Sequence, residues 1–224
     1  MNIKVNEKLL AHVLPFRDAS AGERGFASGF GARDRFIQVD EGVIRWERDF
    51  YSTFPGAYPV SELQMDLELD FDEDYLLMPS VTYNGNPFGG GKDPFGFDHN
   101  GEPVSYASGR TAVPACSFAQ NDEFAVGLFA DPRTLPENCG VSGSIVKKEG
   151  KKTILRLLAP EQEMPVIFAR MSTYIPGYRN TVLVDSAKPL TVTAYIVYGQ
   201  REEGLPGYRE YTKKVKYRLI PFIW

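Results

Sequence analysis

The fold class is decided by the stretch Leu63-Gln64-Met65-Asp66-Leu67-Glu68-Leu69-Asp70-Phe71, in which apolar and polar residues alternate without a break. A period of two places successive side chains on opposite faces of a β-strand. One face of this strand is apolar and the other is acidic, which is typical of an antiparallel sheet with one buried face.

A second alternating stretch lies over residues 44 to 54. Its apolar side chains are Ile44, Trp46 and Phe50, and the charged ones that point the other way are Arg45, Glu47 and Asp49. Further strand-like runs cover residues 124–130, 143–148, 151–158 and 190–198. Residues 148 to 151 join two of these runs and predict a hairpin turn.

Helix signals are sparse, because 21 glycines and 16 prolines leave few windows long enough for a helix. Residues 5 to 14 have helical spacing and predict one short helix, which Pro15 ends. The sequence therefore predicts an all-β protein, a large antiparallel β-sandwich with few or short helices. We expect one sandwich domain over residues 1–204 and a C-terminal segment over residues 205–224.

The composition excludes several classes of protein. The chain has 224 residues, of which 43% are hydrophobic, and this suffices for one large core. A net charge of -4 with scattered Lys and Arg offers no basic face for nucleic acid, and no apolar run approaches the roughly 20 residues that cross a bilayer. The first residues lack the apolar region of a secretory signal. We expect a cytoplasmic protein with no nucleic-acid and no membrane partner.

The two cysteines are too few for a disulfide framework. Cys116 lies in the strand-like run 114–118 and is expected to be a small buried hydrophobe. Cys139 lies in a polar segment and is expected to be an exposed loop thiol.

Residues 83 to 118 form a long polar and aromatic segment, rich in Gly and Pro, between two strand-like runs. Loops of this length are usually functional or disordered, and the aromatic residues argue against disorder. We interpret the segment as a binding loop on a β scaffold.

Three motifs occur in order along the chain: Leu-Met-Pro-Ser-Val-Thr-Tyr-Asn-Gly-Asn-Pro-Phe at 77–88, Gly109-Arg110 leading to Pro114, and Ala-Pro-Glu-Gln-Glu at 159–163. They resemble the N-terminal β-sandwich domain of bacterial glycoside hydrolases whose catalytic domain is an (α/α)6 barrel. The resemblance implies a supersandwich, similar to the galactose mutarotase-like fold, that packs against the helical barrel. No helical barrel follows Trp224, so it also implies that the general acid and base lie outside this chain.

The binding loop supplies the residue types that contact sugars. Aromatic faces stack on C–H surfaces, and planar amides, carboxylates and Arg form pairs of hydrogen bonds with hydroxyl groups. The alternative is that the Asn-Gly pairs are tight turns and the aromatic rings cap the end of the sandwich. The candidate carbohydrate contacts are Tyr83, Asn84, Asn86, Phe88, Asp98, His99, Tyr106 and Arg110.

Catalytic and metal sites find little support in the residue pattern. The acidic face of residues 66–74 has the spacing of an acid pair, but we interpret it as a solvated sheet face, because charge on the outer face of a half-buried strand needs no function. Glu161 and Glu163 are interpreted as turn or edge residues. Residues 98–102 have the alternating oxygens of half a calcium loop, with Pro103 where the loop needs Gly. The catalytic residues are left unassigned, and no cofactor and no metal are expected.

Two functions of different class remain open. The first is a non-catalytic domain that supports a carbohydrate-active helical domain, absent from this chain, and lends a loop to its sugar site. On this view the chain alone is inactive and the parent protein is a glycoside hydrolase. The second is a stand-alone carbohydrate-binding or aldose-epimerase-like domain, which requires an acid and a base in one pocket.

Overall fold

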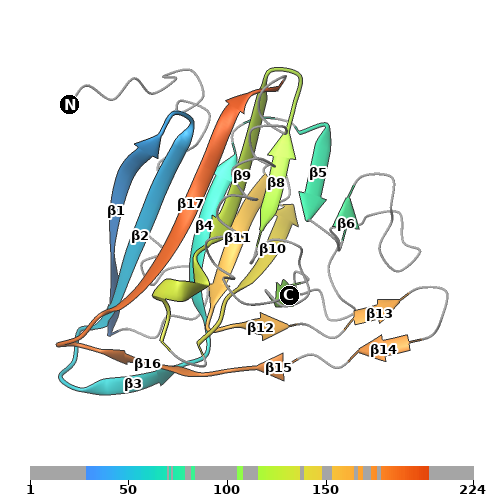
Figure 1. The fold of residues 1–224 in the computed structure, drawn as a ribbon. Helices are drawn as coiled ribbons and strands as arrows, with labels where there is room; N and C mark the ends of the chain where they lie inside the picture. Colours follow the sequence, from blue (N-terminus) through green and yellow to red (C-terminus); the bar gives the residue numbers. More distant parts are fainter. Residues whose placement is uncertain are drawn as a thin grey trace, which may run out of the picture.

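Two antiparallel sheets packed face to face form the body of the protein (Figure 1). The computed structural model describes residues 29–69, 71, 73–78, 82–83, 105–107, 116–136, 139–147, 153–163, 166–168, 173–175 and 178–201. The all-β prediction is confirmed, because every strand pairing in these residues is antiparallel and the helical content is minimal.

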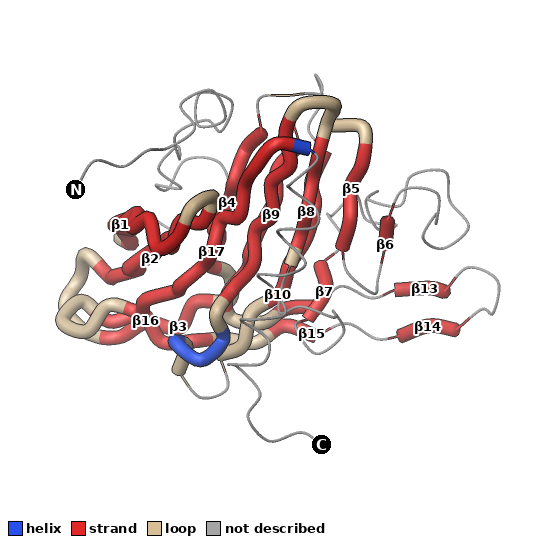
Figure 2. Tube along the Cα trace, turned by 45° about the horizontal axis from the view of Figure 1, so that its top comes forward, coloured by secondary structure: helices blue, strands red, loops and turns tan. Residues whose placement is uncertain are grey.

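The larger sheet has seven strands in the order β1-β2-β17-β9-β8-β5-β6. Their bounds are β1 (Phe30–Asp40), β2 (Val43–Ser52), β17 (Leu190–Gln200), β9 (Phe124–Ala130), β8 (Ser117–Gln120), β5 (Tyr75–Met78) and β6 (Thr82–Tyr83). Figure 2 gives a second view in which β1 lies at one edge of this sheet and β5 and β6 at the other.

The smaller sheet has four strands in the order β4-β11-β10-β7, and three two-stranded ribbons complete the fold. The sheet strands are β4 (Leu63–Leu69), β11 (Thr153–Ala159), β10 (Ser142–Lys147) and β7 (Ser105–Ala107). The ribbons pair β3 (Ala57–Val60) with β16 (Val182–Asp185), β12 (Gln162–Glu163) with β15 (Tyr178–Arg179), and β13 (Val166–Phe168) with β14 (Thr173–Ile175). A short 3-10 helix, η3 (Pro132–Thr134), follows β9.

The main core lies between the two sheets, and the alternation of the sequence predicts its members. Trp46 of β2, Leu67 of β4 and Leu155 of β11 are buried in one cluster with Val126 of β9 and Val192 of β17. The strands expected over 44–54, 63–71, 124–130, 143–148, 151–158 and 190–198 are all present within a few residues. The charged alternates of β2 and β4 point to the opposite faces.

One charged residue breaks the alternation of β2. Arg48 occupies a core-facing position and is 1% exposed. Its guanidinium forms two hydrogen bonds to Asp34 of β1, from Nε to Oδ1 and from Nη2 to Oδ2, each 2.7 Å. The indole Nε1–H of Trp46 donates to the same Oδ1 at 2.6 Å, and Arg48 Nη1 donates to the carbonyl of Gln64 at 3.1 Å. The ion pair of Arg48 with Asp34 neutralises the buried guanidinium, and because Asp34 belongs to β1 it also fixes β1 to the core.

A second apolar cluster covers part of the outer face of the seven-stranded sheet, the face directed away from the four-stranded sheet. We call it the outer apolar cluster; Tyr75, Leu77 and Tyr195 pack against it. Its buried members are Val43, Cys116, Phe118, Ala125, Phe129 and Val197. The strands β8 and β9 are therefore buried on both faces, which accounts for the nearly continuous apolar run over 124–130.

Two local expectations are corrected. The segment 83–118 is not one uninterrupted loop, because residues 105–107 form the edge strand β7, which pairs with β10. Cys139 is not an exposed thiol, because it is 1% exposed in the main core cluster. Its backbone holds it there, since the carbonyl of Cys139 accepts a 2.7 Å hydrogen bond from the Glu161 N–H. Cys116 is buried as expected.

Several predictions lie outside the described residues. They are the helix over 5–14, the turn over 148–151, the calcium-like segment 98–102, both histidines, and the C-terminal segment with its domain boundary. In the part of the chain that the structure describes, no helix is long and apolar enough to cross a membrane.

Candidate functional site

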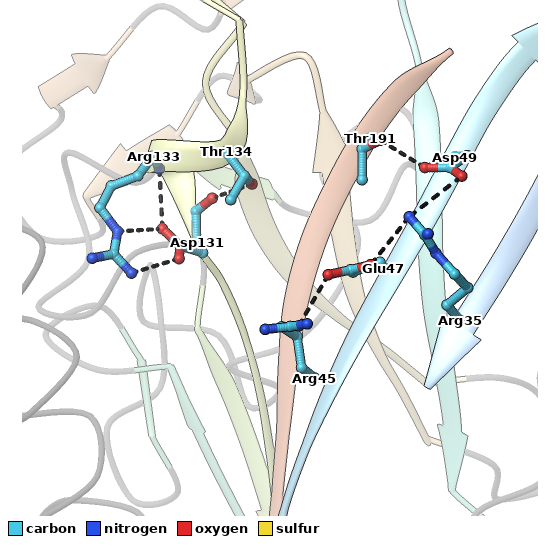
Figure 3. Close-up of polar contacts among 8 residues, drawn as sticks. All are labelled: Arg35, Arg45, Glu47, Asp49, Asp131, Arg133, Thr134 and Thr191. Atoms are coloured by element: carbon cyan, nitrogen blue, oxygen red, sulfur yellow. Dashed lines mark hydrogen bonds and ion pairs between the residues drawn. The ribbon is translucent and has the colours of Figure 1, made fainter. Parts of the chain in front are cut away.

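A group of charged side chains lies on the outer face of the seven-stranded sheet, beside the outer apolar cluster. The alternation of β2 directs Arg45, Glu47 and Asp49 to this face. Its other members come from β1, β17 and the residues after β9. We call the group the charged face; it comprises Arg35, Arg45, Glu47, Asp49, Asp131, Arg133, Thr191 and Tyr195 (Figure 3, which draws all of these but Tyr195).

Register brings the first part of the charged face together. Arg35 of β1 lies opposite Glu47, and Thr191 of β17 lies opposite Asp49. Arg35 Nη2 is 3.1 Å from Glu47 Oε2 and 3.6 Å from Asp49 Oδ2, and the Thr191 hydroxyl donates to Asp49 Oδ1 at 2.6 Å. These contacts cross three neighbouring strands and fix both carboxylates on a rigid support (Figure 3).

Arg45 completes this part of the face. Its Nε lies 3.0 Å from Glu47 Oε1, close enough for an ion pair. The angle does not make a hydrogen bond, so this sheltered N–H is not satisfied within the described protein. Glu47 is therefore shared between two guanidinium groups, and both retain N–H donors for a ligand.

Asp131 organises the second part of the charged face, where β9 ends. Its carboxylate accepts hydrogen bonds from the Arg133 backbone N–H at 3.1 Å, from Arg133 Nε at 2.9 Å and from Nη2 at 2.7 Å. The Thr134 hydroxyl donates to the carbonyl of Asp131 at 2.9 Å, and the Asp131 N–H donates to the carbonyl of Thr193. The turn through η3 is thereby held against β17, with the Arg133 side chain half-exposed.

Tyr195 lies between the two parts, opposite Arg45 on β2 and Phe129 on β9. Its ring stacks on Phe129 with centroids 5.3 Å apart and an interplanar angle of 18°. Partial burial, followed by the negative charge of Asp131, raises the pKa of Tyr195 above its usual value, while Arg45 and Arg133 act in the opposite direction. Tyr195 therefore stays a phenol at neutral pH and can donate its proton in a hydrogen bond.

The charged face has the chemistry of a binding surface for polar, hydroxyl-rich molecules. Guanidinium groups supply planar pairs of donors, carboxylates supply pairs of acceptors, and the phenol supplies both a hydrogen-bonding group and an aromatic edge. Within the described ranges, no group of three or more His, Cys, Asp or Glu side chains is placed to hold a metal ion.

The structure describes two of the eight carbohydrate contacts predicted from the sequence. Tyr83 lies in β6, which pairs with β5. Tyr106 lies in β7 and is 4% exposed, with its ring in the main core cluster and its pKa raised, first by burial and then by the charge of Glu163. Its side chain packs in the core and offers no open face. Outside the described residues lie the other six, Asn84, Asn86, Phe88, Asp98, His99 and Arg110.

Sequence reasoning missed the charged face as a site. The alternation of β2 placed Arg45, Glu47 and Asp49 on one face, but a solvated sheet face has the same pattern. What distinguishes them is the pairing with Arg35 and Thr191, which are distant in sequence. Only the strand order brings these residues together.

Comparisons with known proteins leave the family open. No protein-family model matches the chain, and no curated protein matches it.

Proposed function

We propose that this chain is a non-catalytic β-sandwich domain that binds carbohydrate through the charged face and accompanies the helical catalytic domain of a glycoside hydrolase. The observation that carries the proposal is the charged face itself, in which arginines, carboxylates and Tyr195 are fixed on the paired strands β1, β2 and β17 and on the turn after β9. The antiparallel sandwich is compatible with the family resemblance of the motifs over residues 77–163.

Carbohydrate is the ligand class that best fits this set of groups. A sugar presents neighbouring hydroxyls that both donate and accept, so it needs donors and acceptors side by side. Glu47 and Asp49 stand next to Arg35 on the adjacent strand β1, and Glu47 also stands next to Arg45 on its own strand, which provides this arrangement. The ion pairs hold the side chains in place before a ligand arrives, which lowers the entropic cost of binding.

The same contacts argue for binding rather than hydrolysis at the charged face. A glycosidase needs one carboxyl group that holds a proton at working pH, and an apolar environment is the usual cause. Each carboxylate of the charged face is engaged by an arginine instead: Glu47 and Asp49 by Arg35, and Asp131 by Arg133. The acid and base of the parent enzyme are therefore assigned to the partner domain.

An exposed apolar ribbon supports the idea of a partner domain. The ribbon of β3 and β16 lies at one end of the sandwich (Figure 1), and Leu183 on it is 62% exposed. Phe54 and Tyr58, which lie just before and within β3, are also exposed. Leu183 pairs with Pro59 and Tyr58 with the buried Val184, so Leu183 and Tyr58 are on opposite faces of the ribbon. We take Leu183 as the apolar group that a partner domain would cover. The reading frame of the parent protein is expected to encode several hundred residues of helical pattern after Trp224, of the order of a second domain.

A binding assay tests the role of the charged face. Soluble oligosaccharides and polysaccharides are titrated into the full chain by calorimetry, and the best ligand is then measured with Arg45→Ala and Tyr195→Phe. Loss of hydrogen bonds to a charged donor should weaken binding about tenfold or more for Arg45→Ala. Asp122→Asn, in the exposed turn at the far end of β9, serves as the matched control and should bind unchanged. Equal affinity in Arg45→Ala and the control would contradict the proposal.

A turnover assay tests the non-catalytic assignment separately. The chain is incubated with a panel of aryl glycosides, and with single anomers of aldoses for mutarotation. We expect no turnover above the uncatalysed rate. Hydrolysis or mutarotation that an Asp or Glu substitution in this chain abolishes would overturn the assignment and favour the stand-alone epimerase-like alternative.

A further inference from the structure

A tyrosine near the end of β2 lies next to the charged face. Tyr51 follows Asp49 in the alternation of β2, so its side chain points to the same outer face of the seven-stranded sheet. It is partly exposed, and in the strand register it lies opposite Gly31 of β1. The outer face therefore carries an aromatic ring directly beside its paired carboxylates and arginines.

Gly31 determines how this ring lies. A Cβ atom placed on Gly31 would be 2.5 Å from Cζ of Tyr51, 2.6 Å from its hydroxyl oxygen and 2.7 Å from Cε2. Cζ is the nearest of the three, whereas a ring placed edge-on would bring the hydroxyl oxygen or Cε2 closer. The ring therefore presents one face to Gly31 and directs the other face away from the sheet. Glycine in a strand permits this close approach, because it has no side chain.

Polar groups that match the hydroxyls of a sugar stand next to the ring of Tyr51. Asp49 is two positions away on β2, about 7 Å along the strand, and the Thr191 hydroxyl holds its carboxylate with a 2.6 Å hydrogen bond. Arg33 of β1 lies opposite Asp49, is exposed, and has its guanidinium carbon 6.0 Å from the ring centroid of Tyr51. An aromatic face with an acceptor and a donor beside it has the composition of a subsite for one sugar ring.

We propose that Tyr51 is the stacking platform at one end of an extended saccharide site, in which a chain of sugar residues lies along β2 from Arg45 to Tyr51. The inference rests on the proposed function, to which it adds the size of the ligand and a further contact residue. Arg45 and Tyr51 are six positions apart on β2, which corresponds to about 20 Å and exceeds the length of a single sugar ring. The preferred ligand is therefore an oligosaccharide or a segment of a polysaccharide.

The outer apolar cluster limits the site at its other end. Val43 precedes Arg45 in the alternation of β2 and is buried in that cluster. Between the two ends, Arg35 pairs with Glu47 and Asp49, which keeps these polar groups in place (Figure 3). The site is thus a polar track along β2 with an apolar boundary at one end and an aromatic ring at the other.

A chain-length series tests the proposal. Cello-, xylo-, manno- and galacturono-oligosaccharides, each from the monosaccharide to the hexasaccharide, are titrated into the full chain by calorimetry. In a series that binds, the affinity should rise with length until the sugar chain spans the site and then level off. Tyr51→Ala should bind the hexasaccharide about two- to tenfold more weakly, because the stacking contact is lost. Tyr51→Phe keeps the ring and should bind as the unaltered chain does.

Gly31→Ala tests the orientation of the ring. Its new Cβ would displace the flexible end of the Tyr51 side chain, since the two would be only 2.5 Å apart, while the ring itself remains. Binding of the hexasaccharide should weaken about as much as in Tyr51→Ala. Tyr58→Ala removes an exposed aromatic residue of β3, outside the proposed site, and serves as the matched control that should bind unchanged.

The outcomes separate this inference from the function on which it rests. Absence of binding in all four series would overturn the proposed function and the platform with it. Equal affinity for the monosaccharide and the hexasaccharide, or unchanged binding in Tyr51→Ala, would overturn the platform alone. A ring over a strand glycine also stabilises the strand pair, so circular dichroism checks that each variant is folded. The dependence of affinity on chain length is measured on the unaltered chain and does not depend on any variant.

Discussion

Replacement of Asp34 by Ala should destabilise the protein strongly, because it leaves a buried guanidinium without its carboxylate. Arg48 is 1% exposed, and Asp34 accepts its two hydrogen bonds at 2.7 Å together with the 2.6 Å bond from the Trp46 indole. In Asp34→Ala all three donors lose their acceptor. Among the described residues, Arg48 keeps its hydrogen bond to the carbonyl of Gln64 and its contacts with the rings of Trp46 and Phe50, none of which supplies a negative charge.

The magnitude follows from the burial of the pair. Removal of one partner from a buried ion pair costs about 3–5 kcal/mol. The side chain of Asp34 retains 18% of its exposure, so water can reach part of the space it leaves and the lower end applies, about 3 kcal/mol. Since 1 kcal/mol shifts the melting temperature by about 2–4 °C in a chain of this size, we expect a fall of about 6–12 °C.

Urea unfolding followed by tryptophan fluorescence and circular dichroism measures the free energy of unfolding. A shift of the urea midpoint is interpreted as a change in stability only if the slope of the free energy of unfolding against urea concentration is unchanged. The double variant Asp34→Leu with Arg48→Met removes both charges and should be more stable than Asp34→Ala, because no charge is left buried and unpaired. Asp122→Asn breaks an exposed ion pair with Arg201 and should show no measurable change. A loss below about 1 kcal/mol in Asp34→Ala would refute the reasoning.

Three further perturbations have defined outcomes. Gly42→Ala places a Cβ 2.5 Å from the carbonyl oxygen of Tyr198 at a φ of 67°, so the free energy of unfolding should fall by about 2–3 kcal/mol in a urea titration. Phe118→Ala should cost about 3–5 kcal/mol in the same assay if the outer apolar cluster is packed like a core, whereas an effect below 1 kcal/mol would show that it is loose. Burial raises the pKa of the Cys139 thiol to about 11, against 9.0 for a free thiol. The stability that the protein gains from keeping the Cys139 thiol protonated is therefore complete below pH 9 and is lost as pH rises toward about 11. The free energy of unfolding of Cys139→Ala should not show this loss. Neither Cys139 nor Cys116 should react with a thiol reagent at neutral pH until the protein unfolds.

The sequence was sufficient for the fold class because the information needed is local. Alternation over residues 63–71 and 44–54 identifies a strand and its buried face without knowledge of the neighbouring strand. The apolar run over 124–130 likewise predicts the strand β9, whereas the burial of both its faces is seen only in the structure. These elements were found because hydrophobic periodicity depends only on residues two positions apart.

The remaining errors and omissions share a non-local cause. Arg48 is a charged residue at a core-facing position of β2, where the alternation calls for an apolar one. Nothing near it in the sequence shows that Asp34 neutralises its charge. Cys139 lies in a polar segment, and its burial depends on a backbone bond to Glu161. Tyr106 was assigned to a loop because three residues are too few to show the period of a strand, and only its pairing with β10 reveals β7.

The outer face of the seven-stranded sheet is divided between an apolar part and a charged part, and the proposed function places the ligand on the charged part. Over β8 and β9 that face is closed by the outer apolar cluster, so Phe118 and Phe129 act as a second core. Over β1 and β2 several of the outward side chains are charged, and Arg35 of β1 pairs with Glu47 and Asp49 of β2. At the start of β17 the outward side chains are threonines. The carboxylates of Glu47 and Asp49 are largely buried, with 18% and 17% of their side chains exposed, so the arginines that pair with them hold them in defined positions. Fixed positions matter where a ligand must meet several groups at once, and this is the physical ground of the proposal that the charged face binds carbohydrate.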